Sequence, residues 1–337
     1  MKRLPYILAA IAMTVAASCQ KETTVAGIGG NENVTISIEI PDGPVTKAVS
    51  KADNIDIIYY EIWTKDWGKQ LYPAEGEYAY IPSSEIKRGT DGKKTATLEV
   101  SLIADQTYEF IFWAQNKNCE AYTVMHLDKI KIDYNVIAAN GNEDKFDAFY
   151  ATHTLTMDGS LTAEESTITL KRPFAQLNFG ASRMNSMVGE VKLENRYITV
   201  SKLSTAFNTI EGVGYSEHTI DNVIFKSNKI MSEKLVTNVS GTDTEYTWIS
   251  MDYMLMPGKE STVTVNASFN LVGFDNSIDF KIGSVPLKQN YRTNIVGDLF
   301  TEDAQLIIVI EDDFIKPDNN LDENGNPLTG GNTTVNP

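Results

Sequence analysis

Short segments in which apolar and polar residues alternate are the main feature of this chain, and they limit the folds that it can adopt. The clearest is Val34-Thr-Ile-Ser-Ile-Glu-Ile40, which alternates without interruption. Because successive side chains of a strand point to opposite faces, this segment predicts a strand with one buried face. The residues expected on that face are Val34, Ile36, Ile38 and Ile40.

Similar segments recur at short spacing along the rest of the chain. We expect strands at 55–64, 94–103, 107–114, 129–134, 148–157, 166–170, 174–179, 190–195, 197–203, 219–225, 247–255, 261–272, 277–282, 290–296 and 304–310. Turn dipeptides such as Asp91-Gly92 and Pro257-Gly258 separate them, and no long segment has the helical period. The sequence therefore predicts an all-β protein, and a pair of β-sandwiches fits this spacing better than any α/β pattern.

The N-terminus has the features of an export signal. Lys2 and Arg3 precede an apolar run at 4–17, which is short for a bilayer span of about 20 residues, so residues 1–18 are predicted to be a signal peptide. The small residues before Cys19 resemble a bacterial lipobox, although Ala16 stands where that motif most often has Leu. The resemblance implies cleavage before Cys19 and its acylation. The alternative is ordinary secretion, with Cys19 as an incidental residue.

The cysteine count and the charge narrow the class of protein further. Lipidation of Cys19 would leave Cys119 without an intramolecular partner, so a disulfide framework is excluded. Asn118 and Glu120 predict that Cys119 lies in a polar loop. Removal of Lys2 and Arg3 takes the basic residues from 29 to 27 against 45 acidic ones, a net charge of −18. Such a charge repels nucleic acid and anionic membrane surfaces, so neither is an expected partner.

Residues that could carry catalysis are scattered. His126, His153 and His218 lie in separate segments, whereas catalysis needs a base close to a nucleophile or a metal. No metal-ligand spacing is present in the sequence. We therefore expect no catalytic residue, no metal and no cofactor, and we predict that the chain is not an enzyme.

Aromatic residues gather between residues 63 and 80. Trp63, Trp67 and Tyr72 could form a platform that stacks on sugar rings. Aromatic residues are also common in strands because they fill a half-buried, pleated surface. The sequence leaves both interpretations open.

Three further motifs carry a resemblance to a known family. They are Tyr108-Glu-Phe-Ile-Phe-Trp-Ala114, Leu170-Lys-Arg-Pro-Phe-Ala-Gln-Leu-Asn-Phe179 and Asn290-Tyr-Arg-Thr-Asn-Ile-Val296. With the lipobox and the alternating first strand, they make the chain similar to the fimbrillins, the lipoprotein-derived type V pilins of Gram-negative anaerobes. The resemblance implies two tandem transthyretin-like Greek-key sandwiches. We place them at 33–175 and 176–316, after a polar tether at 19–32 and before a polar tail at 317–337.

The resemblance also implies how such a subunit assembles. In that family a protease cuts after a basic residue that follows the first strand, and Lys47 and Ala48 occupy the matching place, although the family more often has Arg. Loss of the first strand would open a groove that a strand of a neighbouring subunit fills. The candidate donor strand is Leu306, Ile307, Ile308, Val309 and Ile310. The alternative is that this apolar run is simply a buried last strand.

The expected function is therefore that of a structural or adhesive pilus subunit. Its expected partners are other pilin subunits, the outer membrane through its lipid anchor, and a glycan or protein on a host or bacterial surface. Its expected location is the cell outer membrane, and the pilus after processing. The alternative is a monomeric surface lipoprotein that binds glycan or protein and keeps its first strand permanently.

Overall fold

A computed structural model describes residues 31–41, 52–74, 77, 79–89, 93–124, 126–158, 166–182, 192–300, 306–311 and 333–335. The predicted signal peptide, Cys19, Lys47 and Ala48 lie outside the described residues. Most of the predicted tether and tail also lies outside them.

The described chain is nearly all β, which confirms the predicted fold class. Its helical elements are α1 (Tyr134–Ala139), η1 (Ala52–Asn54), η2 (Lys65–Trp67) and η3 (Asp144–Phe146). Within the described ranges, no helix is long and apolar enough to cross a membrane.

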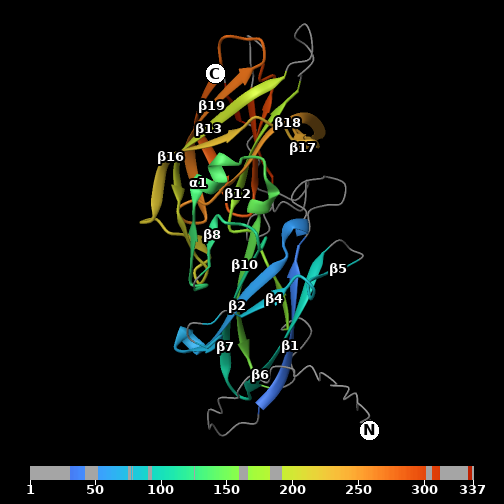
Figure 1. Ribbon diagram of the computed structural model, residues 1–337, viewed down its shortest axis with the longest axis vertical. Helices are drawn as coiled ribbons and strands as arrows, with labels where there is room; N and C mark the ends of the chain where they lie inside the picture. Colours follow the sequence, from blue (N-terminus) through green and yellow to red (C-terminus); the bar gives the residue numbers. More distant parts are fainter. Residues whose placement is uncertain are drawn as a thin grey trace, which may run out of the picture.

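Two sheets form the lower half of the molecule in Figure 1. One has the strand order β11-β1-β6-β5, and the other has the order β10-β7-β2-β3 with β4 paired to β2. Their strands are β1 (Asn31–Ile40), β2 (Ile57–Thr64), β3 (Gln70–Tyr72), β4 (Ala79–Pro82), β5 (Lys87–Arg88), β6 (Lys94–Ile103), β7 (Thr107–Gln115), β10 (Ala148–Thr156) and β11 (Thr167–Thr169). They enclose a cluster of buried apolar side chains, the first core, which includes Ile36, Ile62, Leu98, Phe110, Phe112 and Phe149.

Two further sheets form the upper half (Figure 1). Their strand orders are β17-β18-β12-β21-β22-β23 and β16-β13-β19-β20. The strands are β12 (Ala175–Ala181), β13 (Leu193–Ser204), β16 (Thr219–Ser227), β17 (Lys234–Val239), β18 (Thr242–Met254), β19 (Glu260–Leu271), β20 (Ile278–Lys288), β21 (Arg292–Gly297), β22 (Leu306–Glu311) and β23 (Thr333–Val335). The buried cluster here, the second core, includes Leu177, Phe179, Ile198, Phe225, Trp248, Val265, Phe269 and Ile295.

A small fifth sheet joins residues from the two halves of the sequence. Its strand order is β15-β14-β9-β8, where the strands are β8 (Tyr122–Thr123), β9 (Lys129–Ile132), β14 (Ala206–Asn208) and β15 (Val213–Gly214). Phe207 pairs with Ile130, so two segments more than 70 residues apart in sequence lie side by side. Phe207 also packs edge to face on Tyr150 of β10, with ring centroids 4.6 Å apart.

The segment around this sheet, residues 119–124 and 126–147, is called the bridging segment. Its buried apolar residues belong to the second core, although they precede β10 and β11 of the first half in sequence. They include Cys119, Tyr122, Ile130, Tyr134, Ile137 and Phe146. The sequence predicted a polar loop at Cys119, but this residue is only 5 % exposed. Its two polar neighbours point to solvent while the thiol packs inward, which corrects that expectation.

The domain division at 175/176 remains a prediction. The two cores are distinct clusters, and the second draws on residues from both sides of that position. Thr333–Val335, inside the predicted tail, forms β23 beside β22.

Candidate functional site

The predicted first strand is β1, and it is part of a sheet on both sides. It pairs antiparallel with β6 along its whole length, from Asn31 opposite Ile103 to Ile40 opposite Lys94. Its C-terminal half also pairs parallel with β11, and Ser37 N donates to Ser166 O at 2.8 Å. Leu170 N donates to Glu39 O at 2.8 Å. Loss of β1 would therefore leave backbone groups of two neighbours without partners.

The four apolar side chains of β1 all face the first core. Val34 is 5 % exposed, Ile36 is 1 % exposed, and Ile38 and Ile40 are fully buried. Burial of a side chain of this size contributes roughly 1.5–3 kcal/mol, so the four together supply about 6–12 kcal/mol before entropy is counted. That range is comparable to the net stability of a whole domain, roughly 5–15 kcal/mol. The first core thus depends on β1.

The ion pair between Glu39 of β1 and Lys93 contributes much less. Glu39 Oε2 lies 3.0 Å from Lys93 Nζ, and the two side chains are 25 % and 45 % exposed. Exposed pairs of this kind contribute about 0–1 kcal/mol because water screens them and both side chains lose freedom. Apolar burial and backbone pairing are therefore what retain β1.

The candidate donor strand is β22, which is also held in its own sheet. It pairs antiparallel with β21, and β23 lies along its other edge. Leu306, Ile308 and Val309 are buried, whereas Ile307 and Ile310 are half-buried. Glu311 Oε2 lies 2.5 Å from Arg292 Nη2, and both side chains are almost fully buried. Release of β22 would therefore separate a buried ion pair.

The predicted aromatic platform divides between two places. Trp63 and Trp67 pack edge to face with ring centroids 6.4 Å apart, and both contact the second core. Tyr72 contacts the first core instead and pairs with the fully buried Ile62. The structure brings the two tryptophans together but places Tyr72 in contact with the other core.

A shallow pocket beside Trp63 contains a residue that the sequence analysis did not select. Glu61, in the middle of β2, is only 4 % exposed. Its Oε2 accepts from Trp63 Nε1 at 3.0 Å, and its Oε1 accepts from Leu127 N at 2.8 Å. Burial raises the pKa of the Glu61 carboxyl, and these two hydrogen bonds oppose the shift in part. The sequence does contain a signal for Glu61, because this residue is the only acid in the apolar run Ile57–Trp63.

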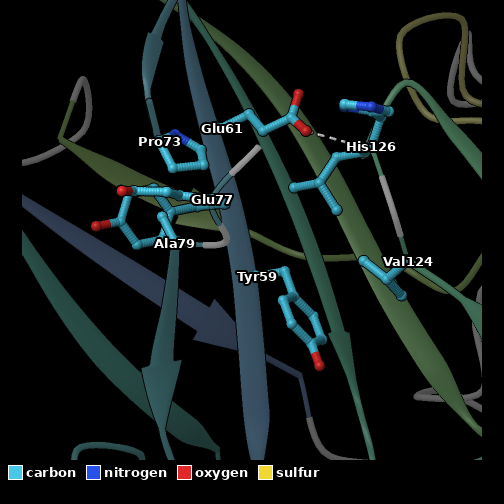
Figure 2. A pocket seen from close by; sticks show the side chains of 9 residues that line it. Tyr59, Glu61, Pro73, Glu77, Ala79, Val124 and His126 are labelled. Atoms are coloured by element: carbon cyan, nitrogen blue, oxygen red, sulfur yellow. Dashed lines mark hydrogen bonds between the residues drawn. The ribbon is translucent and has the colours of Figure 1, made fainter. Parts of the chain in front are cut away.

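Figure 2 shows the walls of this pocket, which we call the Glu61 pocket. The Glu61 side chain points from β2 toward the loop that carries His126. Its lining includes the side chains of Tyr59, Glu61, Pro73, Glu77, Val124 and His126. Among the described residues, no group of three or more His, Cys, Asp or Glu side chains is placed to hold a metal ion.

These features define an all-β protein of packed sheets in which an N-terminal strand completes the first core. The chain belongs to a family of unknown function, DUF6562, whose model matches residues 23–333. No curated protein matches the chain.

Two solved structures that resemble the chain are described as fimbrial proteins. One is a fimbrial assembly protein from Parabacteroides distasonis, which is 12 % identical with a TM-score of 0.44, over 83 % of this chain and 96 % of that one. The other is the tip fimbrial protein Mfa3 from Porphyromonas gingivalis, with a C-terminal truncation, which is 12 % identical with a TM-score of 0.46, over 83 % of this chain and 100 % of that one. The fimbrial descriptions apply to those two proteins.

Proposed function

We propose that the protein is a structural or adhesive subunit of a cell-surface pilus, exported as an outer-membrane lipoprotein through Cys19. Cleavage after Lys47 removes β1, and a strand from another subunit takes its place. The fimbrillin-like motifs of the sequence support this proposal. The observation that carries it is the seat of β1, where four buried side chains and two neighbouring strands form one continuous slot.

The chemistry of the slot sets the requirements for a replacement strand. The uncovered edges of β6 and β11 offer backbone groups to any extended segment, which gives affinity. The alternate pockets select apolar side chains two residues apart. Leu306, Ile308 and Ile310 have this spacing, so the segment 306–310 can fill three of the four positions.

The test compares two forms of the protein, one beginning at Gln20 and one beginning at Ala48. We expect the shorter monomer to melt at a lower temperature, because it lacks the side chains that fill the first core. A synthetic peptide of residues 33–41 should restore the melting temperature. The same peptide carrying Ile36→Asp and Ile38→Asp keeps the backbone but should not restore it. Equal melting temperatures for the two monomers would contradict the proposal.

Assembly is measured separately. Light trypsin digestion of the longer form should cut after Lys47 and give oligomers that survive detergent. Mass spectrometry of the N-terminus in cells distinguishes the anchored form, which begins at acylated Cys19, from the processed form, which begins at Ala48. A processed protein that stays monomeric would argue against strand exchange.

A second function, that of a monomeric surface lipoprotein which binds glycan or protein, is favoured by one observation. Withdrawal of β22 would leave Arg292 buried without Glu311. Loss of one partner of a buried ion pair costs about 3–5 kcal/mol. If β22 never leaves its sheet, either another segment is the donor or the protein does not polymerise. Arg292→Leu with Glu311→Leu tests this, because removal of both charges should speed polymerisation if release of β22 limits it.

A further inference from the structure

The base of the Glu61 pocket holds a carboxylate that is buried without a cationic hydrogen-bond partner. Trp63 and Leu127 satisfy one lone pair on each oxygen, and a carboxylate can accept more hydrogen bonds than these two. Among the described residues, no Lys or Arg forms an ion pair with Glu61. A buried acid without a cation is unfavourable for stability, and such groups gather at functional sites.

Next to the pocket, beside its lining residue Tyr59, lies an aromatic side chain that the protein leaves half exposed. Tyr80 of β4 lies opposite Tyr59 of β2, with ring centroids 6.3 Å apart and ring planes at 59°. Tyr80 is 53 % exposed, so its ring face is open to a ligand. Pro73 and Val124 add apolar surface on either side of Glu61 (Figure 2).

The rim of the Glu61 pocket adds polar groups. Glu77 and His126 line the mouth together with the apolar groups. The enclosed space is about the size of one water molecule, and the rest of the hollow is open to solvent. A single hydroxyl group can therefore enter beside Glu61, whereas a ring must lie outside the pocket.

We propose that the Glu61 pocket and Tyr80 bind one uncharged sugar unit of a glycan. The C–H face of the ring packs on Tyr80 and Tyr59, and ring hydroxyls donate to the carboxylates of Glu61 and Glu77. Acidic sugars are rejected because both side chains are carboxylates and the chain carries a net charge of −16. The inference does not depend on strand exchange, and it applies to a monomer or a pilus subunit alike.

The experiment uses the soluble chain beginning at Gln20 and measures binding by saturation-transfer NMR and calorimetry. The probes are the methyl glycosides of glucose, galactose, mannose and N-acetylglucosamine, with glucuronic acid and Nα-acetyl-lysine amide as charged comparisons. At least one neutral glycoside should bind, and glucuronic acid should not. The lysine derivative tests the rival interpretation, in which the buried carboxylate receives a cation.

The variant Tyr80→Ala should weaken binding roughly three- to tenfold, as expected for loss of one stacking partner. The matched control is Phe274→Ala, because Phe274 has the same 53 % exposure but lies in the turn between β19 and β20. This control should bind like the parent, and both variants should keep its melting temperature because both side chains are exposed. The exposed Glu77→Gln should also weaken binding.

Three results would overturn the proposal. The first is that no neutral glycoside binds the parent protein. The second is that Tyr80→Ala and Phe274→Ala bind equally well. The third is that glucuronic acid or the lysine derivative binds as tightly as the best neutral glycoside.

Discussion

Asp144 is half-buried at the start of η3, and its buried Oδ1 has no hydrogen-bond partner. Burial raises its pKa to about 7, and the nearby acids Asp147 and Glu233 add to the shift. The folded protein therefore holds this proton more tightly than the unfolded chain, where Asp titrates near pH 3.9. The free energy of unfolding should fall as the pH rises from about 4 to 7, by at most about 4 kcal/mol from this group, and then level off.

Asp144→Asn removes the titrating carboxyl group. The variant's free energy of unfolding should therefore depend less on pH between about 4 and 7. Denaturant unfolding at pH 4.5 and pH 8 measures the difference, and the variant should be more stable than the parent at pH 8. Asp221→Asn, at an exposed position on β16, is the control and should follow the parent. If Asp144→Asn and Asp221→Asn give the same pH profile, Asp144 does not carry the effect.

Cys119 belongs to the second core, and burial raises the pKa of its thiol. Because the thiolate is the reactive form, the folded protein should react very slowly with iodoacetamide at pH 8. The same thiol should be alkylated quickly in 6 M guanidinium chloride. Mass spectrometry of the chain beginning at Gln20, which has no other cysteine, measures both rates. Fast labelling of the folded protein would place Cys119 at the surface.

Among the structural elements, the bridging segment is joined to the second half by a group of side-chain hydrogen bonds. Asn142 Oδ1 accepts from Arg196 Nη2 and from Met251 N, each at 2.8 Å, and its Nδ2 donates to Lys229 O at 2.7 Å. Arg196 is itself buried and paired with Asp252. Asn142→Ala leaves several of these groups without a partner, so we expect a loss of about 2–4 kcal/mol in unfolding free energy.

Asn140→Ala is the matched control, because the exposed Asn140 makes one local side-chain bond, from Nδ2 to Val136 O. Its loss should be below about 1 kcal/mol. Chemical denaturation of both variants gives the comparison. Equal losses would mean that the bonds of Asn142 do not hold the bridging segment in place.

The sequence predicted the long strands well because each carries its own apolar period. The predicted strand at 94–103 coincides with β6, and those at 190–195 and 197–203 are one strand, β13, with a register shift near Leu193. The predicted strand at 129–134 ends at Ile132 instead. Asp133 caps α1 there by accepting from Asn135 N at 2.8 Å, a signal that the sequence contains.

The short strands and the pocket could not be predicted in the same way. β8 has two residues and β14 has three, so neither shows a period, and each exists because a distant segment lies beside it. Glu61 stands out in its strand, but its function as the base of a pocket requires Leu127, 66 residues away in sequence. Tyr72 follows Trp63 closely in sequence, yet contacts the other core, because the hairpin of β2 and β3 changes register there.

At the scale of the whole molecule, the second core needs residues from both halves of the sequence. A fragment of residues 176–316 lacks the bridging segment and would expose the apolar surface that Tyr122, Tyr134 and Phe146 cover. We expect this fragment alone to be largely unfolded by circular dichroism and NMR. Co-expression with residues 20–175 should recover a folded complex. A fragment that melts cooperatively by itself would instead support a division at 175/176.

The way β1 pairs with its neighbours makes its resistance to force depend on the direction of the pull. A pull at Asn31 along the strand axis loads the backbone bonds between β1 and β6 together, in shear, over ten residues. A pull that lifts Ile40 away from the sheet loads one hydrogen bond at a time, so the pairing of β1 and β6 breaks sequentially. The same strand thus resists a pull along its axis and yields to one that peels it from the sheet, so a modest peeling force at Ile40 achieves what a much larger axial force at Asn31 does not.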